Sequence, residues 1–198
     1  MNLYLPDTVT AGEHVIDIRT DYRDVLTVFE AYEDPNLSDE DKTEAMIRIM
    51  FPEPEQIRCL TPEEQKEAVR GVLSFISGGR SPDEKKQGGP RLLSWTQDIE
   101  YIIAPVNRII GQDVRAMDHL HWWTFLSAFR EIGGEATLSQ ILQIRKKKIR
   151  GQKMEKWEKE WYQQNRDAVD LKTVYTDREN EFLKIWTGSD MNDTRDQD

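Results

Sequence analysis

Apolar residues recur at every third or fourth position through most of the 198-residue chain, with polar residues between them. This spacing is typical of amphipathic helices. In the first half, Thr20 is expected to cap one helix. Ser38 with Asp41, a weaker relative of the capping box, is expected to open a second helix, and the capping box of Thr61 and Glu64 a third. The apolar positions expected to be buried in these helices are Tyr22, Val25, Leu26, Phe29, Tyr32, Met46, Ile49, Met50, Val69, Val72, Leu73 and Ile76.

The second half shows the same period. Ser94 and Thr137 each precede a glutamine by three residues, so both are expected to open helices, and Asp118 is expected to cap the helix between them. Pro105 should kink the helix behind Ser94, because a proline removes a backbone donor. The expected buried positions are Ile99, Ile102, Ile103, Val106, Ile110, Trp122, Phe125, Leu126, Phe129, Leu138, Ile141, Leu142 and Ile144.

Beyond Gly151 the apolar pattern narrows to Met154, Trp157 and Trp161, which lie among lysines and glutamates. So thin a seam predicts a peripheral helix that touches a single neighbour. A further short helix is expected around residues 182–186.

The first twenty residues follow a different pattern. Residues 7–10 and 14–18 flank a turn that contains Gly12, and the second stretch is rich in β-branched side chains, which predicts a hairpin. A two-stranded hairpin is marginal in water, so it must lie on the helices or on another subunit. The predicted fold is therefore mainly α, a small helical domain of about seven helices with an N-terminal β-hairpin.

The glycine-rich, charged stretch at residues 78–91 contains almost nothing that can be buried, which indicates a linker between two helical halves. The expected organisation is a hairpin plus helices in 1–77, a flexible linker in 78–91, the second helical half of the same domain in 92–150, basic and aromatic peripheral helices in 151–187, and a disordered acidic tail in 188–198.

Charge is distributed unevenly along the chain. The net charge of −10 disfavours general nucleic-acid binding. Residues 1–60 carry five basic and fourteen acidic groups, whereas residues 145–166 carry nine basic and three acidic groups. The basic segment, with its cluster at residues 145–150, is interpreted as a solvated helix, as a contact for an acidic partner, or as a contact for the chain's own acidic face.

No residue pattern predicts catalysis or a cofactor. His119 and His121 are two residues apart and point to different faces of a helix, so they do not form a metal pair, and His14 lies far away in sequence. The single cysteine, Cys59, forms no internal disulfide and suits a reducing cytoplasm. We therefore expect a non-enzymatic protein without metal or cofactor, and without a membrane span or a signal peptide.

Two acids and two tryptophans complete the candidates. Asp98 and Glu100 fall in the first turn of a predicted helix, where an acid usually serves the helix dipole. Trp122 and Trp123 are neighbours about 100° apart around a helix, so one ring should face the core. Trp122 matches the buried stripe. Trp123 then lies at an edge or a subunit contact, unless a wide core covers both rings.

Five segments resemble the bacteriophage gene-product-fifteen family of siphophage tail gene clusters, and the resemblance covers most of residues 5–165. The most specific segment is His119-Leu120-His121-Trp122-Trp123-Thr124-Phe125, with Ile144-Arg145 downstream. The others are the Leu5-Pro6-Asp7 start, Ile18-Arg19-Thr20-Asp21-Tyr22-Arg23, Ser94-Trp95-Thr96-Gln97-Asp98 with Tyr101-Ile102, and Lys156-Trp157-Glu158. Ala104-Pro105 and the long acidic C-terminus depart from the family pattern.

The resemblance implies a tail assembly chaperone in the host bacterial cytoplasm. Such a protein would bind the tape measure protein and recruit subunits of the major tail protein, and it could form a homo-oligomer. The candidate partner-binding residues are Trp122, Trp123, Met154, Trp157 and Trp161. Two alternatives stay open: a structural tail or connector component whose hairpin joins a neighbour's sheet, and an enzyme that acts through acidic residues.

Overall fold

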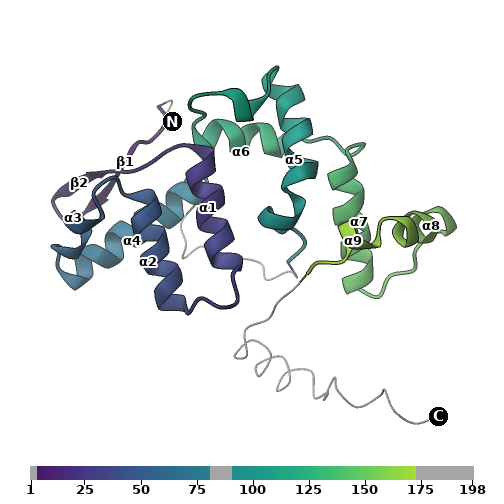
Figure 1. The fold of residues 1–198 in the computed structure, drawn as a ribbon, viewed down its shortest axis with the longest axis horizontal. Coiled ribbons are helices and arrows are strands. Elements are labelled where there is room, and N and C mark those ends of the chain that lie inside the picture. The colour runs from purple at the N-terminus through teal and green to yellow at the C-terminus, as the bar shows by residue number, and fades with distance from the viewer. Residues whose placement is uncertain (1–3, 81–90, 173–198) are drawn as a thin grey trace, which may run out of the picture.

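The computed structural model describes residues 4–80 and 91–172, and this part of the chain is mainly helical with an N-terminal β-hairpin (Figure 1). The predicted fold class is confirmed. The described elements are β1 (Thr8–Ala11), β2 (His14–Asp17), α1 (Tyr22–Glu33), α2 (Asp39–Met50), α3 (Pro54–Arg58), α4 (Pro62–Ile76), α5 (Trp95–Ile110), the 3-10 helix η1 (Val114–Ala116), α6 (Trp122–Arg130), α7 (Thr137–Ile149), α8 (Lys156–Gln164) and α9 (Arg166–Val169).

The hairpin lies on the helices of its own chain. β1 and β2 pair antiparallel, with Val9 opposite Ile16, and both side chains are buried. The Val9 side chain presses against α4 at Gly71, where a Cβ would lie 2.8 Å from the Cβ of Val9. This contact supplies the packing that a two-stranded hairpin lacks in isolation.

The capping boxes at Ser38 and Thr61 are confirmed, because each hydroxyl accepts from a backbone N–H three residues later and the acid at that position reaches back. Three other predicted caps are wrong. Asp21 caps α1 in place of Thr20, and His121 caps α6 in place of Asp118. Helix α7 has Ala136 at the cap position and no side-chain cap.

The helix α5 begins with half of the predicted box. The Ser94 hydroxyl accepts from the backbone N–H of Gln97, but the backbone N–H of Ser94 donates to Asp98 rather than to Gln97. Pro105 lies inside α5, which continues as one helix to Ile110. Gly111 ends it in the left-handed region, with φ of 88°, where glycine meets no steric penalty.

An aromatic cluster fills the centre of the main core. The Trp122 ring is fully buried and packs between Trp95, Phe125 and Phe29, at centroid distances of 5.6, 5.7 and 6.0 Å. Tyr22 stacks on Phe125 at 4.6 Å. These rings come from α1, α5 and α6, so the cluster joins the two halves of the chain around one core.

The two halves are also joined by backbone hydrogen bonds. The N–H of Tyr22 donates to the carbonyl of Leu120, and the N–H of Trp122 donates to the carbonyl of Thr20. The carboxylate of Asp21 accepts from the N–H of Leu120 at 2.9 Å and from Arg23. The residues before α1 and before α6 therefore form one short bridge.

Helices α7 to α9 lie at one end of the molecule, away from the hairpin (Figure 1). Ile141, Ile144 and Val169 are buried there outside the main apolar cluster, to which α7 contributes the buried Leu138 and the partly buried Leu142. This end of the molecule therefore has a small core of its own. Residues 182–186, where a further helix was predicted, lie outside the described residues.

Candidate functional site

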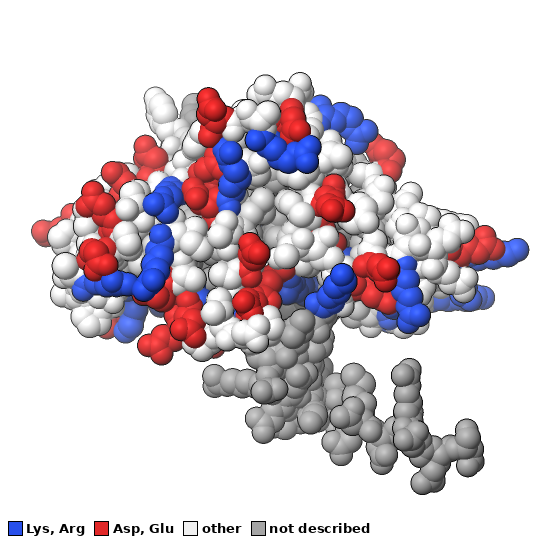
Figure 2. Space-filling model, viewed as in Figure 1, with Lys and Arg blue, Asp and Glu red and all other residues white. Residues whose placement is uncertain are grey.

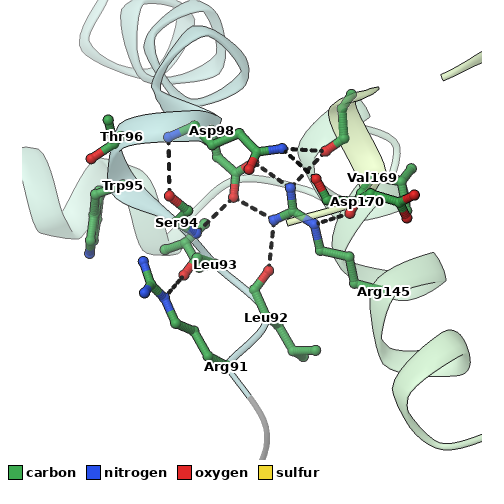
Figure 3. Close-up of polar contacts among 12 residues, drawn as sticks. Arg91, Leu92, Leu93, Ser94, Trp95, Thr96, Asp98, Arg145, Val169 and Asp170 are labelled. Carbon is green, nitrogen blue, oxygen red and sulfur yellow. Dashed lines mark hydrogen bonds and ion pairs between the residues drawn. The ribbon is translucent and has the colours of Figure 1, made fainter. Parts of the chain in front are cut away.

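A buried ion pair joins α5 to α7. The Arg145 guanidinium donates to the carboxylate of Asp98 through two bonds of 2.6 and 2.8 Å, and the two side chains are 2% and 0% exposed (Figure 3). Two parallel bonds of this kind match the planar guanidinium to the carboxylate. Asp98 was predicted only to interact with the dipole of α5, but it also forms a buried ion pair with Arg145.

Arg145 also ties down two other segments. It donates to the carbonyl of Leu92 before α5, and to the carbonyls of Ala168 and Val169 at the end of α9, at 2.7 to 2.8 Å (Figure 3). We call this set the junction: Leu92, Asp98, Arg145, Ala168 and Val169. A single buried cation thereby holds three segments that are far apart in the sequence.

Two side chains extend the junction on the side of α5. The Gln97 amide donates to the carbonyls of Asp167 and Asp170, and it accepts from the backbone N–H of Lys172. Glu33, the last residue of α1, accepts from the Ser94 hydroxyl and from the N–H of Trp95. The first turn of α5 is therefore satisfied by side chains from α1 and by its own Asp98.

The junction is a closed network. Among the described residues, no buried side-chain nitrogen or oxygen lacks a hydrogen-bond partner. Each buried side-chain nitrogen and oxygen of the junction therefore has at least one partner within the chain. The junction holds α7 and α9 against α5, and α8 is in turn held by α7.

Helix α8 is held to α7 by charge. Lys147 donates to both carboxylate oxygens of Glu158 at 2.6 and 2.7 Å, and Glu158 is 1% exposed. The bonds from Lys147 and from the N–H of Glu155 lower the pKa of the Glu158 carboxyl. The most buried residue of α8 is thus an acid.

A second polar group closes the same region. Lys148 pairs with Asp170, and the Tyr162 hydroxyl lies between them, 2.7 Å from the Lys148 ammonium and 3.1 Å from the carboxylate. Burial raises the pKa of Asp170, but the hydrogen bonds from Lys148, Tyr162 and Arg166 outweigh it, so that pKa lies below its ordinary value. Three of the basic residues at 145–150 therefore bind the chain's own acids.

The five predicted partner-binding residues fall into two separate places. Trp122 is fully buried and its indole donates to the carbonyl of Ile76, so its ring belongs to the core. Trp123 is half-buried at the end of α4, where its indole donates to the carbonyl of Phe75. The edge position expected for Trp123 is thus occupied by the chain's own helix.

The other three residues lie on or beside α8. Met154 and Trp161 are half-buried, whereas Trp157 is 54% exposed. Glu158, the neighbour of Trp157 in sequence, is the residue of α8 that contacts α7. Trp157 is instead the most exposed tryptophan ring of the described residues.

A groove of about 860 Å³ lies between the end of α1, the start of α5, and α9. Glu30, Asp34, Glu100 and Asp167 line it together with Tyr101. Figure 2 shows that acidic side chains also gather over α2 to α4, at the left of the view. The acidic character of the first 60 residues is therefore a property of the surface.

His119 and His121 contact segments that are distant in the sequence. His121 accepts from the N–H of Trp123 and its other ring nitrogen contacts the carbonyl of Pro6 at 3.0 Å. His119 contacts the Thr20 hydroxyl at 3.0 Å. In the described part of the chain, no group of three or more His, Cys, Asp or Glu side chains is placed to hold a metal ion.

Reasoning from the sequence missed Asp98–Arg145 and Lys147–Glu158. The partners are 47 positions apart in the first pair and 11 in the second. The sequence therefore shows four ordinary charged residues and does not indicate which of them pair. One indication was available: Asp98, Arg145 and Glu158 all occur in segments that carry the family resemblance.

The fold and this site define a small helical protein with an N-terminal hairpin, in which buried charges join distant segments. A family model described as Bacteriophage Gp15 protein matches residues 1–171, and the chain belongs to this family. It is therefore a bacteriophage protein of the structural or assembly-related kind. Comparison with curated proteins and with solved structures gives no match. Within residues 4–80 and 91–172, no helix combines the length and apolar character needed to cross a membrane.

Proposed function

We propose that this protein is a non-enzymatic tail assembly chaperone that binds the tape measure protein in the host cytoplasm and helps to recruit subunits of the major tail protein. Membership in the bacteriophage family supports an assembly role. The observation that carries the binding role is the exposure of Trp157, at 54%, on a peripheral helix. A large aromatic ring in such a place is a typical anchor for a protein partner.

The surroundings of Trp157 indicate what the partner carries. Lys153, Lys156 and Lys159 are exposed and lie close to it in sequence. Of the two acids within α8, Glu158 is buried against Lys147, whereas Glu160 is exposed and lies 4.0 Å from Lys156. A partner helix with an apolar stripe flanked by acids complements this arrangement. A tape measure segment of that kind would gain cover for its apolar stripe, which otherwise favours aggregation.

Co-expression with the tape measure protein tests this function. The wild-type chain should capture the tape measure in a pull-down, and Trp157→Ala should reduce the affinity about thirtyfold, because hot-spot aromatics contribute about 2 kcal/mol or more. Ile109→Ala is the matched control, since Ile109 is 42% exposed on α5. Equal capture by the wild type and Trp157→Ala would contradict the proposal that Trp157 contacts the tape measure protein.

A structural tail or connector component is the second candidate function. The observation that favours it is the hairpin, where Val15 of β2 is 71% exposed and the two-stranded sheet has a free edge at β2 in the described residues. A strand from a neighbour could add there. Mass spectrometry of purified particles separates the two functions, because a chaperone is absent from finished particles and a structural component is present in stoichiometric amounts.

A further inference from the structure

The outer edge of β2 carries backbone groups that point away from the chain's own sheet. The N–H of Ile18 donates to the carbonyl of Asp7 at 2.9 Å, and this pair lies one position beyond the pair Thr8–Asp17. Hydrogen-bonded and non-hydrogen-bonded pairs alternate along an antiparallel ladder. Asp17 and, two residues before it, Val15 therefore belong to non-hydrogen-bonded pairs. Their N–H and C=O groups point away from β1.

This edge is free but short. Within residues 4–80 and 91–172, no group hydrogen-bonds to the backbone of Val15 or Asp17 on the side away from β1, and the Val15 side chain is 71% exposed. The next outward N–H, that of Arg19, donates to the carbonyl of Met50 at 2.7 Å, so the end of α2 closes the edge there. The free edge therefore offers the backbone of two residues, and a short extended strand is the structure that fits it.

The charges along the edge favour a second copy of the chain as the occupant. Residues opposite each other share a face, so two hairpins keep their helix-covered faces on one side only when the two-fold axis lies at a residue. An axis at Val15 would place Asp17 opposite Glu13, and an axis at Asp17 would place two Asp17 carboxylates together, which is unfavourable. An axis at Ile16 places Val15 opposite Asp17 and Glu13 beside Arg19. This register brings opposite charges together at both ends.

We propose that two copies of this chain pair antiparallel along β2, with Val15 of each copy opposite Asp17 of the other. Each such pair exchanges two backbone hydrogen bonds, and the two-stranded sheets become one sheet across the dimer. The contact is small, so the dimer is weak and forms as the concentration rises. Helix α8 lies at the opposite end of the molecule from the hairpin, so Trp157 stays free in the dimer (Figure 1).

This contact rests on the free edge of β2 and needs no tape measure protein. It names the neighbour that the second candidate function leaves open, as another copy of the same chain. Purified chain in solution tests the contact, whereas capture of the tape measure and mass spectrometry of particles test the function. Each can therefore fail while the other stands.

Disulfide trapping tests the register. In a Cys59→Ser background, which removes the exposed natural thiol, chains with Val15→Cys and chains with Asp17→Cys are mixed and oxidised in a glutathione buffer. The mixture should give roughly tenfold more linked dimer than Val15→Cys alone, because opposite residues lie within disulfide range and diagonal ones do not. Thr10→Cys mixed with Asp17→Cys is the matched control, since Thr10 is exposed on β1. Equal yields from the mixture and from either comparison would overturn the pairing.

Sedimentation velocity over a concentration series tests the dimer itself. The dimer fraction of the wild type should rise with concentration. Val15→Pro removes an outward N–H and leaves the ladder to β1 intact, so it should raise the dissociation constant about tenfold or more. Thr10→Pro is the matched control, because the Thr10 N–H points outward at the other edge. A wild type that stays monomeric would leave the edge to a strand of another protein and overturn the proposal, as would an unchanged dimer in Val15→Pro.

A charge exchange decides the question if Val15→Pro fails to fold by circular dichroism. Glu13→Arg puts like charges beside Arg19 and should weaken the dimer severalfold, whereas Glu13→Arg with Arg19→Glu should restore it. Arg19 also donates to the carbonyl of Ile49, so circular dichroism must show that the double variant is folded. No effect of Glu13→Arg, or no recovery in a folded double variant, would overturn the proposed register.

Discussion

At the scale of single residues, the decisive feature is that buried charges are paired with complete hydrogen bonding. Removing Asp98 and Arg145 from water carries a large desolvation cost, which the two-bond geometry and three carbonyl acceptors offset. The pair therefore contributes more to specifying where α7 and α9 dock than to net stability. Loss of one partner is severe, because the other is left buried and unpaired.

Substitution of either partner measures this effect. We expect Arg145→Met to lower the free energy of unfolding by about 3–5 kcal/mol, and Asp98→Leu with Arg145→Met to recover much of the loss. Urea denaturation followed by circular dichroism gives both values. Arg115→Met is the control, because its ion pair with Asp113 is exposed and should contribute little. A double variant as unstable as the single one would contradict this account.

The Glu158 carboxyl makes the position of α8 dependent on pH. Its pKa lies below the ordinary 4.5, because Lys147 binds the charged form. The stabilisation is therefore complete above about pH 4.5 and is lost as the pH falls through the lowered pKa of the folded state. Hydrogen exchange of residues 156–164 should accelerate in that acid window, and Glu158→Gln should remove the dependence. An unchanged pH profile in that variant would assign the effect to another group.

At the scale of elements, the hairpin and α4 are fitted to each other at one glycine. Glycine inside a helix usually destabilises it by about 1 kcal/mol relative to alanine. At Gly71, however, a Cβ would lie 2.8 Å from the Cβ of Val9 and 3.0 Å from its Cγ1. The close approach of strand and helix requires the missing side chain, and this explains a helix-weakening residue in the middle of α4.

Gly71→Ala should therefore destabilise the protein despite its better helix propensity. Overpacking typically costs about 1–3 kcal/mol, which exceeds the gain of about 1 kcal/mol from alanine. Thermal unfolding provides the measurement. Adding Val9→Gly, which removes the Cβ as well as the Cγ1, should relieve the clash, so that Gly71→Ala is no worse in that background. Gly134→Ala meets nothing within 4 Å and is the control. A more stable Gly71→Ala variant would show that the strand moves away at little cost.

At the scale of the whole molecule, α7 to α9 are attached to the body through the junction and through Leu138 and Leu142 of α7, which pack on the main cluster. Ile141, Ile144 and Val169 form a small core apart from the main cluster, and Arg145 with Gln97 supplies the polar links to α5. Weakening the junction should therefore release this end without unfolding the rest. Such an arrangement suits a region that must present a binding face.

Hydrogen exchange of the Arg145→Met variant tests this division. Amides of α8 and α9 should exchange faster than in the wild type, while those of α4, buried under the hairpin, should keep their protection under native conditions. Equal acceleration in all helices would mean that the chain unfolds as a single unit and that the junction does not separate two parts.

Much of the fold followed from local rules. The capping boxes at Ser38 and Thr61 were predictable because each is completed within four residues. The buried face of α6 was predictable from its period. The caps at Asp21 and His121 were not, because Asp21 accepts from Leu120, 99 positions away, and the ring of His121 also contacts Pro6. The segments that carry the family resemblance are largely these long-range joints.

The sequence by itself determined the longer helices, the hairpin and the family, because periodicity and motifs depend on residues that are close in sequence. The short helices α3, η1 and α9 were not predicted. The tertiary structure alone decided which charges are structural and which aromatic ring is exposed. An isolated acid in the first turn of a helix looks the same whether it faces water or Arg145. Only the folded chain brings Asp98 to that guanidinium and turns Glu158 inward, and this leaves Trp157 at the surface. Burial depends on distant partners, which local spacing does not encode.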